Sequence, residues 1–164
     1  MSENSVPPKK IAIFVDVQNI YYTTRDSFAR QFNYRAFWRQ IRQEGEIVTA
    51  NAYAIQRSDD QQHKFQQALK HIGFDVKLKP FIQRRDGSAK GDWDVGITID
   101  VMEAAPNVDI VVLLSGDGDF ELLLRKVMLR DGVKTHVYGV TELTAQALIN
   151  SASKFFPIDN HLLI

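Results

Sequence analysis

Two short, uninterrupted apolar segments constrain the fold of this chain more than any other feature of its sequence. Residues 10–16 read KIAIFVD and residues 108–114 read VDIVVLL, and both are rich in β-branched side chains. Apolar runs of this length, without alternating polar positions, are typical of buried strands in a parallel sheet. We therefore expect these two segments to be central strands.

Strand and helix patterns alternate along the rest of the sequence. Further strands are predicted at residues 47–55, 74–81, 133–138 and 155–158, and the apolar–polar alternation of 74–81 suits an edge strand. Helices are predicted at residues 19–25, 34–44, 60–72, 92–105, 119–130 and 141–151, with a turn-rich loop at 83–92. This order predicts an α/β fold with a mainly parallel sheet of about five or six strands and right-handed crossovers. Ligands of such sheets bind at the carboxyl ends of the strands.

The length of 164 residues fits one domain. We expect residues 1–9 to be a disordered tail and residues 10–164 to form that domain. The tail contains no apolar run, and the longest apolar runs elsewhere are far shorter than a membrane-spanning helix. The sequence therefore predicts a soluble, cytoplasmic protein.

Composition narrows the chemistry that is open to the chain. The 20 Lys and Arg residues balance the 20 Asp and Glu residues, so any nucleic-acid binding must come from a local basic patch. The absence of cysteine excludes a disulfide framework, a cysteine zinc site and a thiol nucleophile. The four histidines are scattered along the sequence, which disfavours a histidine metal site. A metal site in this chain is expected to use oxygen ligands.

Acidic residues stand at the ends of the predicted central strands. Asp16 ends the first of them, Asp117 and Asp119 follow the second, and Asp92 and Asp94 open a helix. If the two strands are neighbours, several carboxylates meet at one sheet edge, where they repel one another unless a cation lies among them. Mg²⁺ and Mn²⁺ prefer such oxygen ligands, so we predict a divalent-metal site.

Each of these signals also has a simpler interpretation. Asp92 and either acid of the run 117–119 can cap the helix that follows, and Asn19 can cap the first helix. Asp16 has no evident capping role, because it ends a strand that is predicted to be buried. Asp100 is expected on a different helix face from the acids that open its helix, so it is a secondary candidate.

Three motifs occur in sequence order at these positions: FVDVQNI at 14–20, KGDWDV at 90–95 leading to Asp100, and LSGDGDF at 114–120, with Gly139 further on. In order, spacing and strand context they resemble the motifs of NYN domains, in the LabA-like branch of the PIN-like nuclease superfamily. The resemblance extends over about residues 10–158. It implies a PIN-like three-layer α/β/α sandwich and ribonuclease chemistry that depends on Mg²⁺ or Mn²⁺.

The resemblance can be carried over residue by residue. It assigns the strand-end aspartate, its companion amide, the helix-start acid, the small polar residue and the paired acids to Asp16, Asn19, Asp94, Ser115, Asp117 and Asp119. One position departs from the family pattern, because relatives often carry an acid where this chain has Ser153. If that acid contributes to the site in relatives, activity in this chain is less secure.

The four aspartates are predicted to be both catalytic residues and metal ligands. Asp16 and Asp117 are expected to ligate a metal ion directly. Asp94 and Asp119 are expected to hold a second ion or to orient a metal-bound water. Together these groups would acidify the attacking water and neutralise charge on the phosphate.

Other polar residues are predicted to support the site or to bind the substrate. Asn19 is expected to contact a phosphate or to fix a carboxylate, Ser115 to support the ligands and Lys90 to touch a phosphate. Arg84 and Arg85 lie in the predicted loop before the acidic helix start, which suits contacts to a nucleic-acid backbone. The resemblance implies that the partner is RNA, single-stranded or structured, although the residues themselves do not distinguish RNA from DNA. No membrane partner is expected.

Aromatic residues and further cations complete the expected binding surface. Tyr21, Tyr22 and Trp93 are candidates for stacking on a base. Core packing is the alternative for each, and it is favoured for the two tyrosines, whereas Trp93 lies between two acids. The additional cations near the site are Arg57, Lys77 and Lys79.

A second function stays open at this point. A non-catalytic RNA-binding or regulatory module that retains the acidic metal pocket would also explain the motifs. The zero net charge and the serine at position 153 favour this alternative slightly. The oligomeric state, including a homo-oligomer, is likewise left open.

Overall fold

The computed structural model describes residues 6–56, 59–80, 82–83, 89–90 and 92–164. One sheet contains the strands β1 (Lys10–Asp16), β2 (Glu46–Gln56), β3 (Asp75–Pro80), β6 (Ile110–Leu114), β7 (Lys134–Gly139) and β8 (Lys154–Pro157). These six strands are all parallel and lie in the order β3-β2-β1-β6-β7-β8. The helices are α1 (Val17–Phe28), α2 (Tyr34–Arg42), α3 (Asp60–Ile72), α4 (Asp94–Ala104), α5 (Glu121–Asp131) and α6 (Gln146–Ser151).

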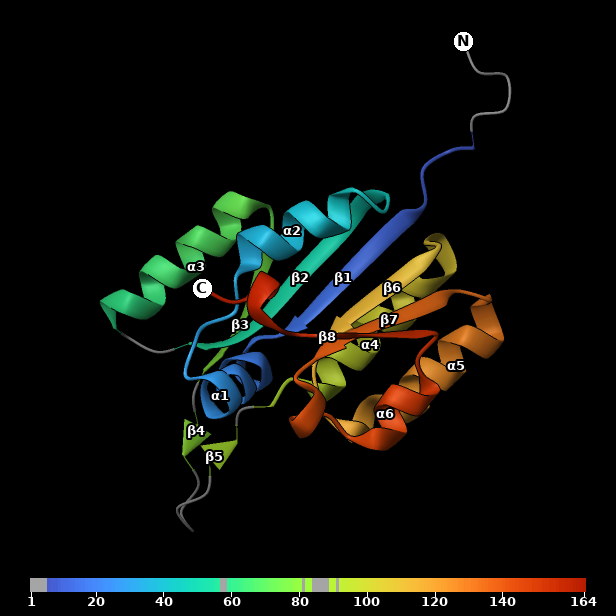
Figure 1. Cartoon of the computed structure of the whole chain (residues 1–164). Helices are drawn as coiled ribbons and strands as arrows, with labels where there is room; N and C mark the ends of the chain where they lie inside the picture. Colours follow the sequence, from blue (N-terminus) through green and yellow to red (C-terminus); the bar gives the residue numbers. More distant parts are fainter. Residues whose placement is uncertain (1–5, 57–58, 81, 84–88, 91) are drawn as a thin grey trace.

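Helices cover both faces of the sheet, which gives three layers (Figure 1). Along β1, Ile11, Ile13 and Val15 belong to the core on the side of α1, α2 and α3. Ala12 and Phe14 belong to the core on the side of α4, α5 and α6. Because both faces of β1 are buried, each position of the strand needs an apolar side chain, which explains the uninterrupted run in the sequence.

The winding of the chain reverses between β1 and β6. From β1 the chain moves outward through β2 to β3, and it then returns to place β6 on the other side of β1. In an open parallel sheet the loops that follow these two strands diverge, and ligands bind between them. Val15 is paired with Leu114, so the residues after β6 begin directly beside Asp16.

The structure confirms the predicted α/β class, and each strand of the main sheet matches a predicted segment, with β3 at an edge. Two predictions are wrong in detail. The loop expected at 83–92 contains part of an antiparallel pair, β4 (Ile82–Gln83) with β5 (Ala89–Lys90). The helix expected at 141–151 begins only at Gln146, because the N–H of Ala145 donates to the Gly116 carbonyl at 3.0 Å.

None of the helices in the described ranges combines the length and the apolar character needed to cross a membrane.

Candidate metal centre

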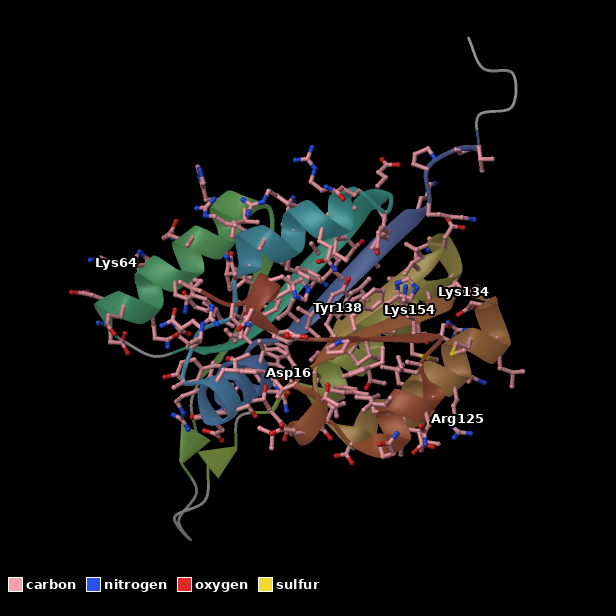
Figure 2. The ribbon with its side chains drawn as sticks, in the orientation of Figure 1. Asp16, Lys64, Arg125, Lys134, Tyr138 and Lys154 are labelled. Carbon is pink, nitrogen blue, oxygen red and sulfur yellow. The ribbon has the colours of Figure 1, made fainter. Side chains whose placement is uncertain are left out.

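The acidic residues of the three motifs lie where the winding of the sheet reverses. Asp16 is the last residue of β1, and Figure 2 shows it at the opposite end of the strands from Lys154. Asp94 opens α4, and Asp117 and Asp119 follow β6. Among the described residues, Asp94, Asp117 and Asp119 each place one carboxylate oxygen within 4.8 Å of the others. We call these three residues the acidic triad.

Ser115 connects Asp16 to the acidic triad. Its hydroxyl donates to Oδ2 of Asp16 at 3.1 Å and accepts from the N–H of Asp117 at 3.2 Å. Ser115 is fully buried, so bulk water does not compete for these hydrogen bonds. Asp16 therefore lies beside the triad rather than within it, and Ser115 fixes the two acids relative to each other.

Asn19 holds the loop that follows β6. Its Oδ1 accepts from the N–H of Gly116 at 2.9 Å. The predicted capping roles need correction, because Asp16 is the N-cap residue of α1, with the N–H of Asn19 at 3.5 Å from its Oδ1. Strand β1 runs into α1 without a loop, so the strand-end acid and the helix cap are the same residue. Asp117 likewise belongs to the acidic triad and caps the short helical turn after β6, since its Oδ1 accepts from the N–H of Asp119 at 2.9 Å.

Burial and crowding of negative charge disfavour ionisation at this site. Burial raises the pKa of Asp16 to about 6, although hydrogen bonds from Ser115 and Asn19 act in the opposite direction. Burial also raises the pKa of Asp94 to about 7, and a hydrogen bond with Asp117 and the charge of that residue add to the rise. Protonated Asp16 and Asp94 are therefore favoured in the folded protein unless a cation binds beside them.

Asp92, which the sequence suggested both as an acid near the site and as a helix cap, contributes to this electrostatic environment. Its negative charge raises the pKa of both Asp16 and Asp94. Its Oδ1 accepts from the N–H of Asp94 at 3.2 Å, but the N-cap residue of α4 is Trp93, and no side chain in the described ranges caps this helix. The predicted capping role of Asp92 is therefore wrong.

These shifts predict how stability depends on pH without metal. The folded protein retains protons on Asp16 and Asp94 up to about pH 6 and 7, whereas the unfolded chain releases them near 3.8. Since the folded state binds more protons between these values, its stability falls as pH rises through this window. In EDTA we expect the contribution of these two groups to lower the melting temperature from about pH 4 to about pH 7, and Mn²⁺ to restore it mainly at the upper end of this range.

The measurement is thermal unfolding followed by circular dichroism across this pH range. Asp94→Asn serves as the matched variant, because it removes one of the two titrating groups and keeps the side-chain size. Its melting temperature should depend less steeply on pH. Equal slopes for the wild type and this variant would contradict the electrostatic account.

The donor set of the site fits a hard divalent cation. Carboxylate oxygens are the ligands that Mg²⁺ and Mn²⁺ prefer, and the triad offers three of them within reach of a single ion. Burial is the main cause of the raised pKa values of Asp16 and Asp94, and the negative charges of the neighbouring acids add to it. Binding of a cation would lower those pKa values and stabilise the charged form.

Lys79 brings positive charge to the edge of this site. Its Nζ donates to the carbonyl of Asp92 at 3.0 Å and lies 4.7 Å from the centre of the Trp93 ring. The Trp93 indole N–H donates to the carbonyl of Ala54 at 2.9 Å, and its ring packs against Tyr53. A base that stacked on the face beneath Lys79 would have to displace it, and stacking on Trp93 stays a prediction.

Four further candidates can be placed. The hydroxyl of Tyr53 donates to Oδ2 of Asp100 at 2.7 Å, and Asp100 is not part of the triad. Lys77 pairs with Asp75 at 3.4 Å on the surface. The predicted core packing of Tyr21 and Tyr22 is wrong, because they are 51% and 37% exposed.

Other predicted binding residues cannot be placed. Arg57, Arg84 and Arg85 lie outside the described residues, and so does the side chain of Lys90.

Ser153, where relatives often carry an acid, lies far from the triad. It precedes β8, and its hydroxyl accepts from the N–H of Thr135 at 2.9 Å at the start of β7. Because all strands of the sheet are parallel, this position is at the amino edge, opposite the carboxyl ends. The side chain of Ser153 therefore lies at the edge of the sheet opposite Asp16 and the acids that follow β6.

Comparison with known proteins gives close and distant matches. The sequence profile described as the NYN domain matches residues 10–159. The chain is 30% identical to the Low amplitude and bright protein LabA of Synechococcus elongatus, over 93% of this chain and 86% of that protein. A crystal structure of a Vibrio parahaemolyticus protein of unknown function is 53% identical, with a TM-score of 0.93 over 98% of this chain and 99% of that one.

A more distant structure shares only the fold. Ribokinase from Giardia lamblia matches with a TM-score of 0.51 and 11% identity, over 92% of this chain and 58% of the ribokinase. Such similarity extends to the doubly wound α/β architecture and no further.

The parallel sheet with an acidic triad at its winding reversal, together with the profile match, places the chain among α/β domains of the PIN-like, nuclease type. Within that class, the chain belongs to the NYN domain family, as the profile match and the identity to LabA show.

Proposed function

We propose that this protein is a divalent-metal-dependent ribonuclease that hydrolyses phosphodiester bonds of RNA at the acidic triad and Asp16. The observation that carries the proposal is the convergence of three carboxylates at the winding reversal of a NYN-family sheet. Similar residues on a binding module would not need four acids at one site, because a phosphate backbone is repelled by them. A cytoplasmic location and RNA as the partner are part of this proposal.

The acidic residues of the site would hold the metal ion. Mg²⁺ or Mn²⁺, when bound, supplies a Lewis acid that acidifies water and neutralises charge on the phosphate. Asp94, Asp117 and Asp119 would hold it, because their oxygens are already gathered. Asp16 would add a fourth carboxylate in an orientation that the buried Ser115 hydroxyl fixes.

The chain's own polar groups would also position the RNA. Asn19 keeps the loop after β6 in place through its hydrogen bond to Gly116, and its side-chain N–H₂ remains able to donate to a phosphate oxygen. Lys79 stands at the edge of the site. Arg84, Arg85 and Lys90 are proposed to supply further contacts to the backbone of a single strand.

The test is cleavage of an end-labelled single-stranded RNA by the purified full chain. Cleavage is expected with Mn²⁺ or Mg²⁺ and not with EDTA, and excess metal added after EDTA should restore it. RNA binding without cleavage under every metal condition would reject the nuclease and favour the non-catalytic module. Cleavage that persists in EDTA would reject the metal mechanism.

A further inference from the structure

A pocket of about 470 Å³ lies beside the acidic site, between α1, α3 and the end of β2. Its wall includes Val17, the residue that directly follows Asp16, so the pocket and the metal centre share the start of α1. The volume falls within the range of roughly 300–1,000 Å³ that is typical of small-ligand sites. None of the described lining residues is charged.

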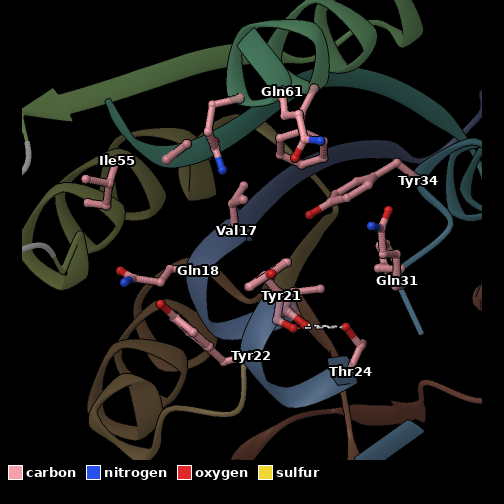
Figure 3. Close-up of a pocket in the computed structure, with 14 residues that line it drawn as sticks. Val17, Gln18, Tyr21, Tyr22, Thr24, Gln31, Tyr34, Ile55 and Gln61 are labelled. Carbon is pink, nitrogen blue, oxygen red and sulfur yellow. Dashed lines mark hydrogen bonds between the residues drawn. The ribbon is translucent and has the colours of Figure 1, made fainter. Parts of the chain in front are cut away.

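The side chain of Tyr34 points a free hydroxyl into this pocket. Tyr34 is only 9% exposed, and its ring packs edge-on against Phe32, Phe65 and Phe74. Figure 3 shows the hydroxyl directed into the space between α1 and α3. Within the described ranges no group forms a hydrogen bond with it, so the polar atom of a buried side chain faces the pocket without a protein partner. Such an atom marks a place where a ligand or water must supply the hydrogen bond.

Four glutamine side chains add hydrogen-bonding capacity around the same space. Gln18 comes from α1, Gln31 from the segment before α2, and Gln61 and Gln62 from the first turn of α3. In the part of the chain that the structure describes, their amides form no side-chain hydrogen bond. Each amide offers both a donor and an acceptor, which is the combination that reads the edge of a nucleobase.

Two exposed rings complete the site. Tyr21 and Tyr22 also line the pocket and lie edge to face, with ring centres 5.3 Å apart. The guanidinium of Arg25 lies over both rings, at 5.5 and 4.8 Å from their centres. The guanidinium pairs with Asp26 at 3.2 Å and covers one face of each ring, so an unpaired base would stack on the ring faces that Arg25 leaves open.

We propose that this pocket, lined by Tyr34, the tyrosines of α1 and the glutamines, binds the nucleobase of an unpaired nucleotide in the RNA substrate. An uncharged wall of aromatic rings and amides matches a planar, neutral group with several donors and acceptors, and it does not match a phosphate or a carboxylate. The neighbouring backbone would then reach the acidic triad. The inference rests on the proposed function and adds base selectivity to it.

The proposal is tested by binding rather than by cleavage. Fluorescence anisotropy in EDTA measures how tightly the wild-type protein binds short labelled oligonucleotides of adenylate, cytidylate or uridylate. The wild type should prefer one of them. Tyr34→Phe should weaken binding of the preferred oligonucleotide by roughly three- to tenfold, which is the effect of losing one hydrogen bond. Binding of the other oligonucleotides should be unchanged.

Two matched variants separate this role from folding. Tyr34→Phe keeps the ring that packs in the core, so its melting temperature should not fall. Gln62→Ala should reduce the same preference, whereas Gln67→Ala, at an exposed position of α3 outside the pocket, should not change it. An unchanged preference in Tyr34→Phe, or no preference in the wild type, would overturn the proposal.

The outcomes also distinguish this proposal from the ribonuclease itself. Base preference without metal-dependent cleavage would overturn only the ribonuclease, and cleavage without base preference would overturn only the pocket. The nucleoside monophosphate that corresponds to each oligonucleotide is added as a competitor in the anisotropy assay. Competition as strong as that of the oligonucleotide would show that a free nucleotide is the occupant and would overturn the assignment to RNA.

Discussion

Asp117→Asn is expected to abolish Mn²⁺-dependent cleavage of single-stranded RNA while the fold remains intact. Asparagine keeps the size of the side chain and an acceptor oxygen, so the hydrogen bond from the N–H of Asp119 can persist. The substitution nevertheless removes an anionic ligand from the acidic triad. The loss of activity should exceed the roughly 10- to 100-fold that follows loss of an outer partner of a metal ligand.

The same substitution should leave the metal-free protein as stable as before or more stable. The charge of Asp117 raises the pKa of both Asp16 and Asp94, so removing it relieves repulsion within the site. The rise in melting temperature that Mn²⁺ causes in the wild type should then shrink, because the variant binds the ion less tightly. Cleavage and melting are therefore measured on the same preparations, with and without Mn²⁺.

Asp109→Asn is the matched control. Asp109 lies at the amino edge of the sheet, where its Oδ2 accepts from the N–H of Lys10 at 2.8 Å, and asparagine can accept the same bond. This variant loses one negative charge far from the triad, so cleavage should be unchanged. Wild-type cleavage by Asp117→Asn would mean that Asp117 is only a cap and would refute the mechanism.

The strand ends of this site are predictable from the sequence because they follow from burial. A strand with apolar residues at every position must lie inside a parallel sheet, so the first polar residue after it marks the edge where ligands bind. For β1 this residue is Asp16, and for β6 it is Ser115, with Asp117 two positions further on. Their placement beside each other then needs only that β1 and β6 are neighbours, which the structure shows.

The contacts that fix these acids are not predictable in the same way. Asn19 and Gly116 are 97 positions apart, and their hydrogen bond depends on the register between β1 and β6. The sequence around Asn19 shows an amide near a helix start, which is equally typical of a cap. A local pattern cannot distinguish a capping amide from one that holds a distant loop.

The pocket beside the site could not be predicted from the sequence for a different reason. Helical spacing predicts that Tyr34 and Phe37 lie on the buried face of α2, and they do. Periodicity assigns a residue to a face but does not say where the end of its side chain points. The hydroxyl of Tyr34 extends past the aromatic core into the pocket, and only the packing of α1, α3 and β2 around it reveals this.

A single added methyl group at Gly116 is expected to disable the site. A Cβ there would lie 2.6 Å from the carbonyl oxygen of Leu143 and 3.2 Å from Cα of Thr144. Both are backbone atoms, so the loop after β6 would have to move. That loop is held by the hydrogen bonds of Gly116 with Asn19 at 2.9 Å and Ala145 at 3.0 Å, and it cannot shift without straining them.

The expected result for Gly116→Ala is therefore a loss of cleavage together with a loss of about 1–3 kcal/mol in the free energy of unfolding. Gly132→Ala provides the contrast, because apart from its chain neighbours no atom lies within 4 Å of an added Cβ, and its positive φ of 67° is what opposes the substitution. This control should lower the melting temperature and keep cleavage, when both are measured below the unfolding transition. If both variants retain cleavage, the position of the loop does not control the acids. If Gly116→Ala alone loses it, the tight approach of this loop to residues 143–145 is what sets the geometry of the metal centre.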